Sequence, residues 1–276
     1  MDVDVLAGVA VVSLAINVPG PVAVARLQAL GADVTKVEPP SGDPLRLASD
    51  TWYAALTAGQ DVRVVDLKTP DGRALLDDLL AGADVLVTSS RTAALQRLGL
   101  DWPSVSSQFE RLCHLEIVGD TESGDAGHDL TYQAANGTVR PPQLPTVLVA
   151  DLAGAERVVA EVLAALLLRA RHGRGVHRVV ALSDVARDMA AAARYGLTAE
   201  GGPLSGVLPA YGVYPTRDGW VAVAALEPHF WRRLCTDLAV DGTREDLEEA
   251  FAQRTARDWE VWARERDLPL VAVVSP

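Results

Sequence analysis

The sequence predicts an α/β fold in which a large domain with a parallel sheet precedes a smaller α+β domain. In the first half of the chain, short β-branched runs alternate with segments of helical spacing, which indicates a parallel sheet covered by helices on both faces. After a stretch rich in Gly and Pro at 201–209, strand-like and helical segments continue in a shorter region. We therefore expect a large domain at 1–200 and a small domain at 201–276.

The first elements of the predicted sheet are short and regular. Strand composition occurs in four apolar runs, at 9–14, 33–37, 62–67 and 84–87. Helical spacing occurs between them, at 22–30 before Gly31 and at 71–80. The pattern is that of a Rossmann-like sheet, and it leaves the order of the strands open.

The later elements begin with a long amphipathic helix from about residue 154 to 172, where Gly173 occupies the stop position. A strand at 177–182 and an alanine-rich helix that ends near Tyr195 follow it. The small domain is expected to begin with two strands joined by a turn, at 211–214 and 220–224. Two helices are expected to follow, at 228–238 and 256–265.

Charge and apolar patterning exclude several classes of protein. The net charge is −12, which argues against a general nucleic-acid binder because such proteins carry a basic face. The most apolar helical stretch, 158–168, contains Glu161 and is too short to span a bilayer. The N-terminus lacks the basic region and apolar run of a signal peptide. We expect a soluble, cytoplasmic protein with neither a nucleic-acid nor a membrane partner.

Phosphate-cradling glycine motifs are absent. No GxGxxG follows the first strand and no GxxxxGK[ST] occurs anywhere. The sequence therefore lacks the glycines that bind phosphate in nicotinamide-dinucleotide and P-loop proteins. Cys113 and Cys235 lie far apart in apolar surroundings, without metal-ligand spacing, and are expected to be reduced thiols. We expect no metal site and no required cofactor.

Polar residues follow several of the predicted strands. Lys36, Lys68 and the segment Ser89-Ser90-Arg91 all lie at strand ends, where ligands of parallel sheets gather. Spacing alone leaves open whether these side chains converge on a ligand or are exposed charges.

Three further residues have the chemistry of acid–base catalysis. Asp151 comes between an apolar run and the long helix, where it is either a helix cap or a catalytic carboxylate. His128 lies in a loop and has a side chain that exchanges protons near neutrality. Glu227 precedes a helix in the small domain, where a purely structural role is the alternative.

Several segments, in order along the chain, are similar to family III CoA transferases and their α-methylacyl-CoA racemase relatives. They are 6–14, the turn 19–21, 30–40 (LGADVTKVEPP), 42–46 (GDPLR), 65–68 (VDLK), 97–100 (RLGL), 163–167 (LAALL), 173–175 (GRG), 211–214 (YGVY) and 227–230 (EPHF). The chain resembles a shortened member, since relatives continue through a segment that returns from the small domain to the large one. It also departs from the family at two loops, 57–61 and 92–93.

The resemblance implies roles for the three acid–base residues. Transferases of the family use the Asp at the position of Asp151 as a nucleophile that carries CoA as a thioester. Racemases pair it with a His from a Gly-His-Asp motif, which Gly127-His128-Asp129 matches, and a glutamate at the position of Glu227 supports that His.

The resemblance also implies a homodimer and an acyl-CoA partner, with coenzyme A present only as part of the substrate. The residues that it places on CoA are Lys36, Val65, Asp66, Leu67, Lys68, Ser89, Ser90, Arg91, Arg97, Gly127, Asp129, Leu130, Thr131 and Tyr132.

The favoured hypothesis is an α-methylacyl-CoA racemase-like enzyme in which Asp151 and His128 transfer protons on opposite faces of the α-carbon. The first alternative is a CoA transferase with Asp151 as nucleophile, which has no need of His128. The second is a related proton-transfer enzyme on a non-CoA or carrier-bound substrate, which would account for the altered loops. A non-catalytic binding protein is the remaining possibility.

Overall fold

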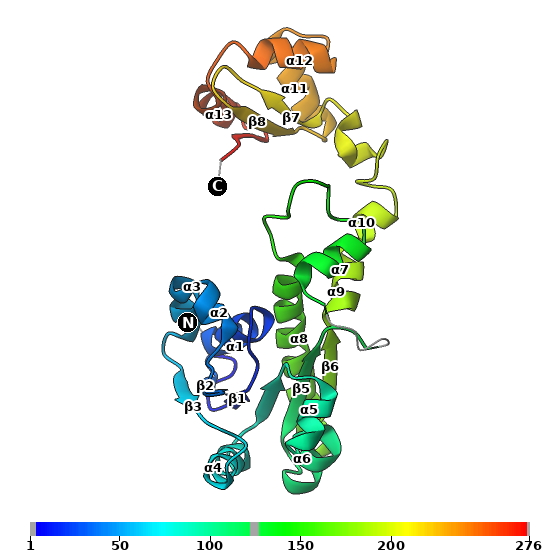
Figure 1. Ribbon diagram of the computed structural model, residues 1–276. Helices are drawn as coiled ribbons and strands as arrows, with labels where there is room; N and C mark the ends of the chain where they lie inside the picture. The colour runs from blue at the N-terminus through cyan, green and yellow to red at the C-terminus, as the bar shows by residue number, and fades with distance from the viewer. Residues whose placement is uncertain (1–3, 122–126, 275–276) are drawn as a thin grey trace. The chain divides into compact units, whose positions relative to one another are not determined.

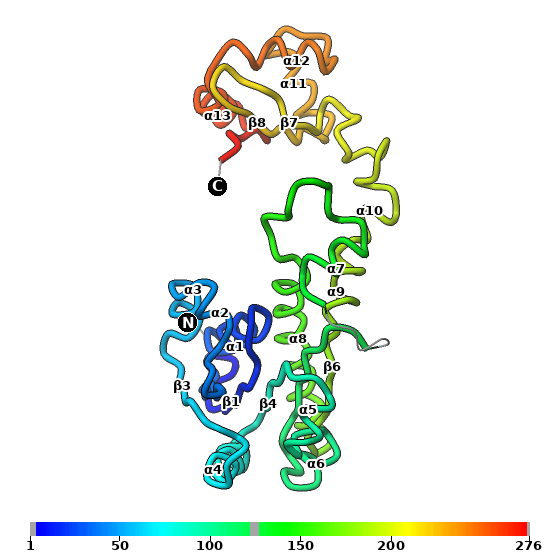
Figure 2. Tube along the Cα trace, in the orientation of Figure 1, coloured from blue at the N-terminus to red at the C-terminus, as the bar shows by residue number. Residues whose placement is uncertain are grey.

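The computed structural model describes residues 4–121 and 127–274. The chain forms two compact units, 1–190 and 191–276, and each is described by itself. The predicted domain boundary after residue 200 lies inside the second unit. Figure 1 shows the elements of both units, and Figure 2 follows the same path as a Cα trace coloured by residue number.

The first unit is built on a parallel sheet of six strands in the order β3-β2-β1-β4-β5-β6. The strands are β1 (Ala10–Ser13), β2 (Asp33–Glu38), β3 (Asp61–Val64), β4 (Val85–Thr88), β5 (Cys113–Val118) and β6 (His177–Ala181). The order reverses between β1 and β4, which makes the carboxyl ends of these two strands the switch point where ligands of such sheets bind. The predicted α/β fold class is confirmed.

Helices cover both faces of this sheet. They are α1 (Pro19–Ala29), α2 (Pro44–Ala48), α3 (Asp50–Thr57), α4 (Pro70–Ala81), α5 (Thr92–Arg97), α6 (Trp102–Gln108), α7 (Asp129–Ala135), α8 (Val149–His172) and α9 (Leu182–Met189). Alternate strand residues enter different cores: Val11 packs with residues of α1 and α8, whereas Val12 packs with residues of α4, α5 and α6. Because side chains alternate across a strand, this division shows that both faces are buried.

The second unit contains an antiparallel sheet in the order β7-β8-β9. Its elements are α10 (Ala191–Arg194), a kinked turn η1 (Pro203–Val207), β7 (Tyr211–Pro215), β8 (Trp220–Ala224), α11 (Pro228–Leu238), α12 (Arg244–Phe251), α13 (Ala256–Arg264) and β9 (Leu270–Ala272). The strand pair and two of the helices match the sequence prediction, which missed α12 and β9. An aromatic core of Tyr214, Phe251, Trp259 and Trp262 joins the sheet to its helices.

Within the described ranges, no helix has the length and apolar character needed to cross a membrane.

A buried charge network fixes the carboxyl ends of β1 and β2. The Lys36 side chain is fully buried, and its Nζ donates to the carbonyl oxygen of Ala15 at 3.0 Å and to Oδ2 of Asp43 at 2.8 Å. Its Nζ also lies 3.4 Å from Oε1 of Glu38, which accepts a hydrogen bond from the Tyr53 hydroxyl at 2.7 Å. Burial and the Glu38 carboxylate raise the pKa of Tyr53 to about 12. The network therefore keeps its charges paired without solvent.

Replacing Lys36 by Met tests this network. The variant leaves the Asp43 and Glu38 carboxylates buried without their counter-charge, so we expect the free energy of unfolding to fall by about 3–5 kcal/mol. Chemical denaturation followed by circular dichroism measures the change. Arg26→Ala is the control, because the Arg26–Glu156 pair is solvent-exposed and its loss costs less than about 1 kcal/mol. Equal effects of the two substitutions would contradict the buried network.

Candidate active site

A cavity of about 480 Å³ opens at the carboxyl ends of β1, β2, β3 and β4. It is lined by Leu14, Ile16, Val37, Glu38, Pro39, Pro40, Ser41, Val65, Asp66, Leu67, Lys68, Ser90, Leu95, Leu98 and Leu100. A second, wider hollow of about 770 Å³ shares Leu67, Lys68 and Leu98 with it and adds Arg73 and Arg97. An apolar chamber thus adjoins a basic one at the edge of the sheet where ligands are expected.

The structure brings together six of the residues predicted to contact CoA. Those that line the two hollows are Val65, Asp66, Leu67, Lys68, Ser90 and Arg97. Ser89 makes a structural contact. Its Oγ accepts a hydrogen bond from the Ile16 amide at 3.0 Å, which joins the ends of β4 and β1. Arg91 is exposed just before α5.

Lys36 lies apart from these groups. Its ammonium is engaged by Ala15, Asp43 and Glu38 inside the protein, so the structure gives it an internal role at the strand end. A direct contact of Lys36 with CoA stays a prediction. The remaining predicted CoA contacts, Gly127 and 129–132, lie in the segment between β5 and α8.

Asp129 joins the starts of α7 and α8. Its side chain is buried, and its Oδ1 accepts hydrogen bonds from the amides of Ala150 at 2.7 Å and Asp151 at 3.2 Å. Its Oδ2 accepts a hydrogen bond from Nε2 of Gln133 at 2.5 Å, and the same nitrogen donates to the carbonyl oxygen of Val147 at 3.0 Å. Asp129 therefore caps α8 from another helix, a role that the sequence reasoning did not give it.

The capping contact places the Asp129 carboxylate close to the Asp151 carboxylate. Asp151 is in the first turn of α8. Burial, and then the nearby Asp129 carboxylate, raise the pKa of Asp151 to about 6, while His128 acts in the opposite direction. A carboxyl group with a pKa close to neutrality both accepts and donates protons readily, which is the requirement for general acid–base catalysis.

His128 is exposed at the start of α7, close enough to Asp151 to lower the pKa of its carboxyl group. Its backbone is fixed by Thr131, whose Oγ1 accepts from the His128 amide at 3.0 Å and donates to the His128 carbonyl oxygen at 2.8 Å. The loop geometry is thus set by local hydrogen bonds, which leave the imidazole at the surface of the site.

Tyr132 lies under the same loop. Its hydroxyl is buried without a hydrogen-bond partner among the described residues, and burial followed by the Asp151 charge raises its pKa. Any side chain at Gly127 would clash with the Tyr132 ring, since a Cβ there would lie 2.5 Å from a ring carbon. Glycine at 127 therefore lets the His128 loop pass over Tyr132.

Glu227 belongs to the second unit, where it is exposed immediately before α11. Its predicted support of His128 stays a prediction.

The family model described as CoA-transferase family III matches residues 6–276. The chain belongs to that family. Among its curated relatives, this family III member is 32% identical to a succinate–glutarate CoA-transferase of Agrobacterium fabrum, over 91% of this chain and 70% of that protein. It is 28% identical to the human α-methylacyl-CoA racemase, over 92% of this chain and 74% of that one.

Solved structures of similar proteins agree with the fold. A hypothetical protein of Mycobacterium tuberculosis superposes with a TM-score of 0.83 at 25% identity, covering 98% of this chain and 83% of that one. A CaiB/BaiF family protein of Brucella suis has a TM-score of 0.80 at 26% identity, covering 98% of this chain and 84% of that one. Because transferases and racemases both occur among the relatives, membership leaves the reaction of this family III protein open.

Asp151→Asn tests the environment of the carboxylate. Asp has a pKa of 3.8 when unperturbed and about 6 at this site. The ionised side chain therefore lowers the free energy of unfolding: the loss is absent below pH 3.8, grows as the pH rises to about 6 and is complete above it. Asn carries no charge, so we expect the variant to be more stable than the parent by about 1–3 kcal/mol above that range and nearly equal to it at low pH. Denaturation curves across this pH range measure the difference, and a constant difference would contradict the raised pKa.

Proposed function

We propose that this family III protein is an α-methylacyl-CoA racemase-like enzyme that inverts the α-carbon of an acyl-CoA thioester. The observation that carries the proposal is the partly buried carboxyl group of Asp151, whose pKa is raised to about 6 and which is near enough to His128 for that residue to lower its pKa. A carboxyl group and an imidazole that serve as the two proton carriers are what a two-base proton transfer needs.

The proposed reaction moves one proton off the α-carbon and another onto its opposite face. Asp151 or His128 removes the α-proton, and the electron pair of the C–H bond moves into the thioester carbonyl to give an enolate. The other group, protonated, then delivers its proton to the α-carbon, and the substrate leaves with inverted configuration. The two residues exchange roles for the other enantiomer, and no cofactor is required.

The enolate oxygen needs hydrogen-bond donors close to this pair. The amides of Ala150 and Asp151 at the start of α8 already donate to Asp129. The first amides of α7, which follow His128 directly, are the proposed donors. Backbone donors fixed in this way stabilise developing negative charge without reorganisation.

The CoA moiety would occupy the two hollows at the carboxyl ends of β1, β2, β3 and β4. The apolar chamber suits the adenine ring, and Lys68 and Arg97 in the basic hollow suit phosphates through charge-assisted hydrogen bonds. Two further parts of the proposal are a homodimer and a glutamate, Glu227, that orients the His128 imidazole.

CoA transfer to a free carboxylate is the second candidate, favoured by the 32% identity to a succinate–glutarate CoA-transferase. Asp151 would then attack the thioester carbonyl, forming an acyl–aspartyl anhydride and releasing the CoA thiolate. This route requires an ionised Asp151 and gives His128 no role at the α-carbon.

Exchange of the α-proton distinguishes the two candidates. We expect the protein to incorporate deuterium from deuterated water at the α-carbon of a 2-methylacyl-CoA, as followed by mass spectrometry. Asp151→Asn and His128→Gln each remove one proton carrier, so each should slow inversion by about 10²–10⁴-fold.

The exposed His172, at the end of α8, supplies the control variant His172→Gln, which should keep the parental rate. CoA transfer to a dicarboxylate, lost in Asp151→Asn but retained in His128→Gln, would overturn the racemase proposal in favour of the transferase.

Binding of free CoA tests the proposed ligand site separately from catalysis. We expect Lys68→Ala and Arg97→Ala each to weaken CoA binding by about 10-fold or more, because each removes a charge-assisted contact to phosphate worth about 1.5–3 kcal/mol. Isothermal titration calorimetry measures the dissociation constants. Arg171→Ala, at an exposed position in the last turn of α8, is the matched control. If all three variants bind CoA like the parent, the hollow is not the CoA site.

A further inference from the structure

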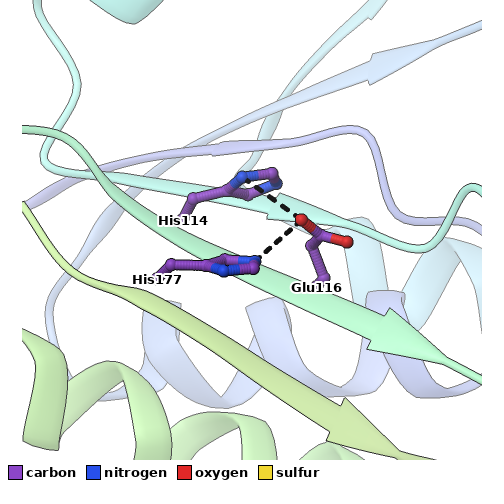
Figure 3. Close-up of side chains that lie close together, drawn as sticks. All are labelled: His114, Glu116 and His177. Atoms are coloured by element: carbon purple, nitrogen blue, oxygen red, sulfur yellow. Dashed lines mark hydrogen bonds and ion pairs between the residues drawn. The ribbon is translucent and has the colours of Figure 1, made fainter. Parts of the chain in front are cut away.

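A cluster of metal-binding side chains lies on β5 and β6. His114 and Glu116 are two residues apart on β5 and therefore project from the same face, and His177 is the direct partner of His114 across the β5–β6 pair. One potential ligand atom from each residue lies within 4.8 Å of the others. Figure 3 shows both imidazole rings directed towards the Glu116 carboxylate.

Glu116 is at the centre of the cluster. Its Oε1 lies 2.8 Å from Nε2 of His177 and 3.7 Å from Nδ1 of His114. The carboxylate is almost completely buried, and His177 remains partly exposed, with 29% of its side chain accessible. The cluster thus combines a buried negative charge with a path from solvent.

The Nδ1 atom of His114 is a buried polar atom without a hydrogen-bond partner among the described residues. The His114 side chain as a whole is fully buried. The other ring nitrogen, Nε2, lies 3.1 Å from the hydroxyl of Thr88 on β4. A buried polar atom without a partner is costly, so a fixed ring nitrogen directed at a carboxylate 3.7 Å away indicates a group that binds between them.

We propose that His114, Glu116 and His177 bind one divalent transition-metal ion, with Zn²⁺ the ion that this donor set suits best. Two imidazole nitrogens and one carboxylate oxygen, with a fourth position open to water, form a common tetrahedral Zn²⁺ set. The ligands would be Nδ1 of His114, Oε1 of Glu116 and Nε2 of His177.

The separations of the two imidazole nitrogens from Oε1 of Glu116 are close to those that this assignment needs. Bonds of about 2.0–2.2 Å to a tetrahedral ion place ligand atoms roughly 3.3 Å apart, and the two measured separations from Oε1, 2.8 and 3.7 Å, lie on either side of that value. Binding replaces the hydrogen bond between His177 and Glu116 by two metal–ligand bonds, and Nε2 of His177 enters the site unprotonated.

Groups around the cluster already orient its rings. The Thr88 hydroxyl contacts the nitrogen of His114 that faces away from the site, and the Trp102 ring stacks on His177 at a centroid distance of 5.4 Å and an angle of 9°. Hydrogen bonds of this kind to the second ring nitrogen typically fix metal-binding histidines.

The proposed ion would have a structural role, separate from the proposed catalysis. β6 is an edge strand whose partner in the sheet is β5, and both histidines lie near the amino-terminal ends of these strands. The hollows proposed for CoA lie at the carboxyl ends of other strands. An ion at the cluster would therefore link the edge strand to the sheet without contacting the acyl-CoA site.

The test is titration of the full-length, chelator-treated protein with Zn²⁺ alone by isothermal titration calorimetry. We expect one ion per chain and a rise in the melting temperature on saturation. His177→Ala and Glu116→Gln should each weaken binding by more than about 10-fold and abolish the rise in melting temperature. Both variants are checked for native circular dichroism before titration.

His172→Ala is the matched control, because His172 is an exposed histidine outside the cluster. Substitution of Co²⁺ gives a second readout, since a tetrahedral site with nitrogen ligands produces visible d–d absorption that His177→Ala should eliminate. The proposal is overturned if the parent binds no Zn²⁺ at stoichiometric concentration, or if binding is as strong in His177→Ala and Glu116→Gln as in the parent.

Discussion

The carboxylate of Asp129 links the two helices that carry the candidate catalytic pair. It accepts hydrogen bonds from the first-turn amides of α8 and from Gln133 within α7, so the helix that begins after His128 and the helix that contains Asp151 share one anchor. The same carboxylate contributes the electrostatic repulsion that raises the pKa of Asp151. One buried carboxylate thus fixes the start of α8 and, after burial, is the second cause of the raised pKa of Asp151.

The local electrostatics of Asp151 combine opposing influences. The start of a helix favours a negative charge, and His128 lowers the pKa, whereas burial and Asp129 raise it. The amides that would favour the ionised form of Asp151 most directly are already hydrogen-bonded to Asp129. Burial, and then the Asp129 charge, therefore outweigh the effect of the helix start, and the pKa of this first-turn carboxyl group is raised.

Local patterns predicted the strands and helices of the parallel sheet because hydrophobic period and helix-stop glycines are properties of neighbouring residues. What they could not predict depends on distant contacts. The internal hydrogen bonds of Lys36 to Asp43 and Ala15 could not be predicted from its neighbours, and its expected contact with CoA stays a prediction. Asp129 was expected to contact CoA, and its capping role depends on two hydrogen bonds that it accepts from the amides of residues 21 and 22 positions away. The pairing of His177 with Glu116, 61 positions apart, follows only from the register of β5 and β6.

The choice between racemase and transferase chemistry depends on the partner of Asp151 more than on Asp151 itself. With a pKa of about 6, the carboxyl group is mostly ionised at neutral pH, which suits a nucleophile and a general base equally well. It is also protonated often enough to return a proton to carbon, a capacity that a nucleophile does not need. In the proposed racemase, His128 completes a proton-transfer pair, whereas it would add nothing to the first attack on a thioester. The Asp151 carboxyl group therefore supports either proposed reaction, and the presence of His128 as a second proton carrier is what favours the proposed inversion of the α-carbon.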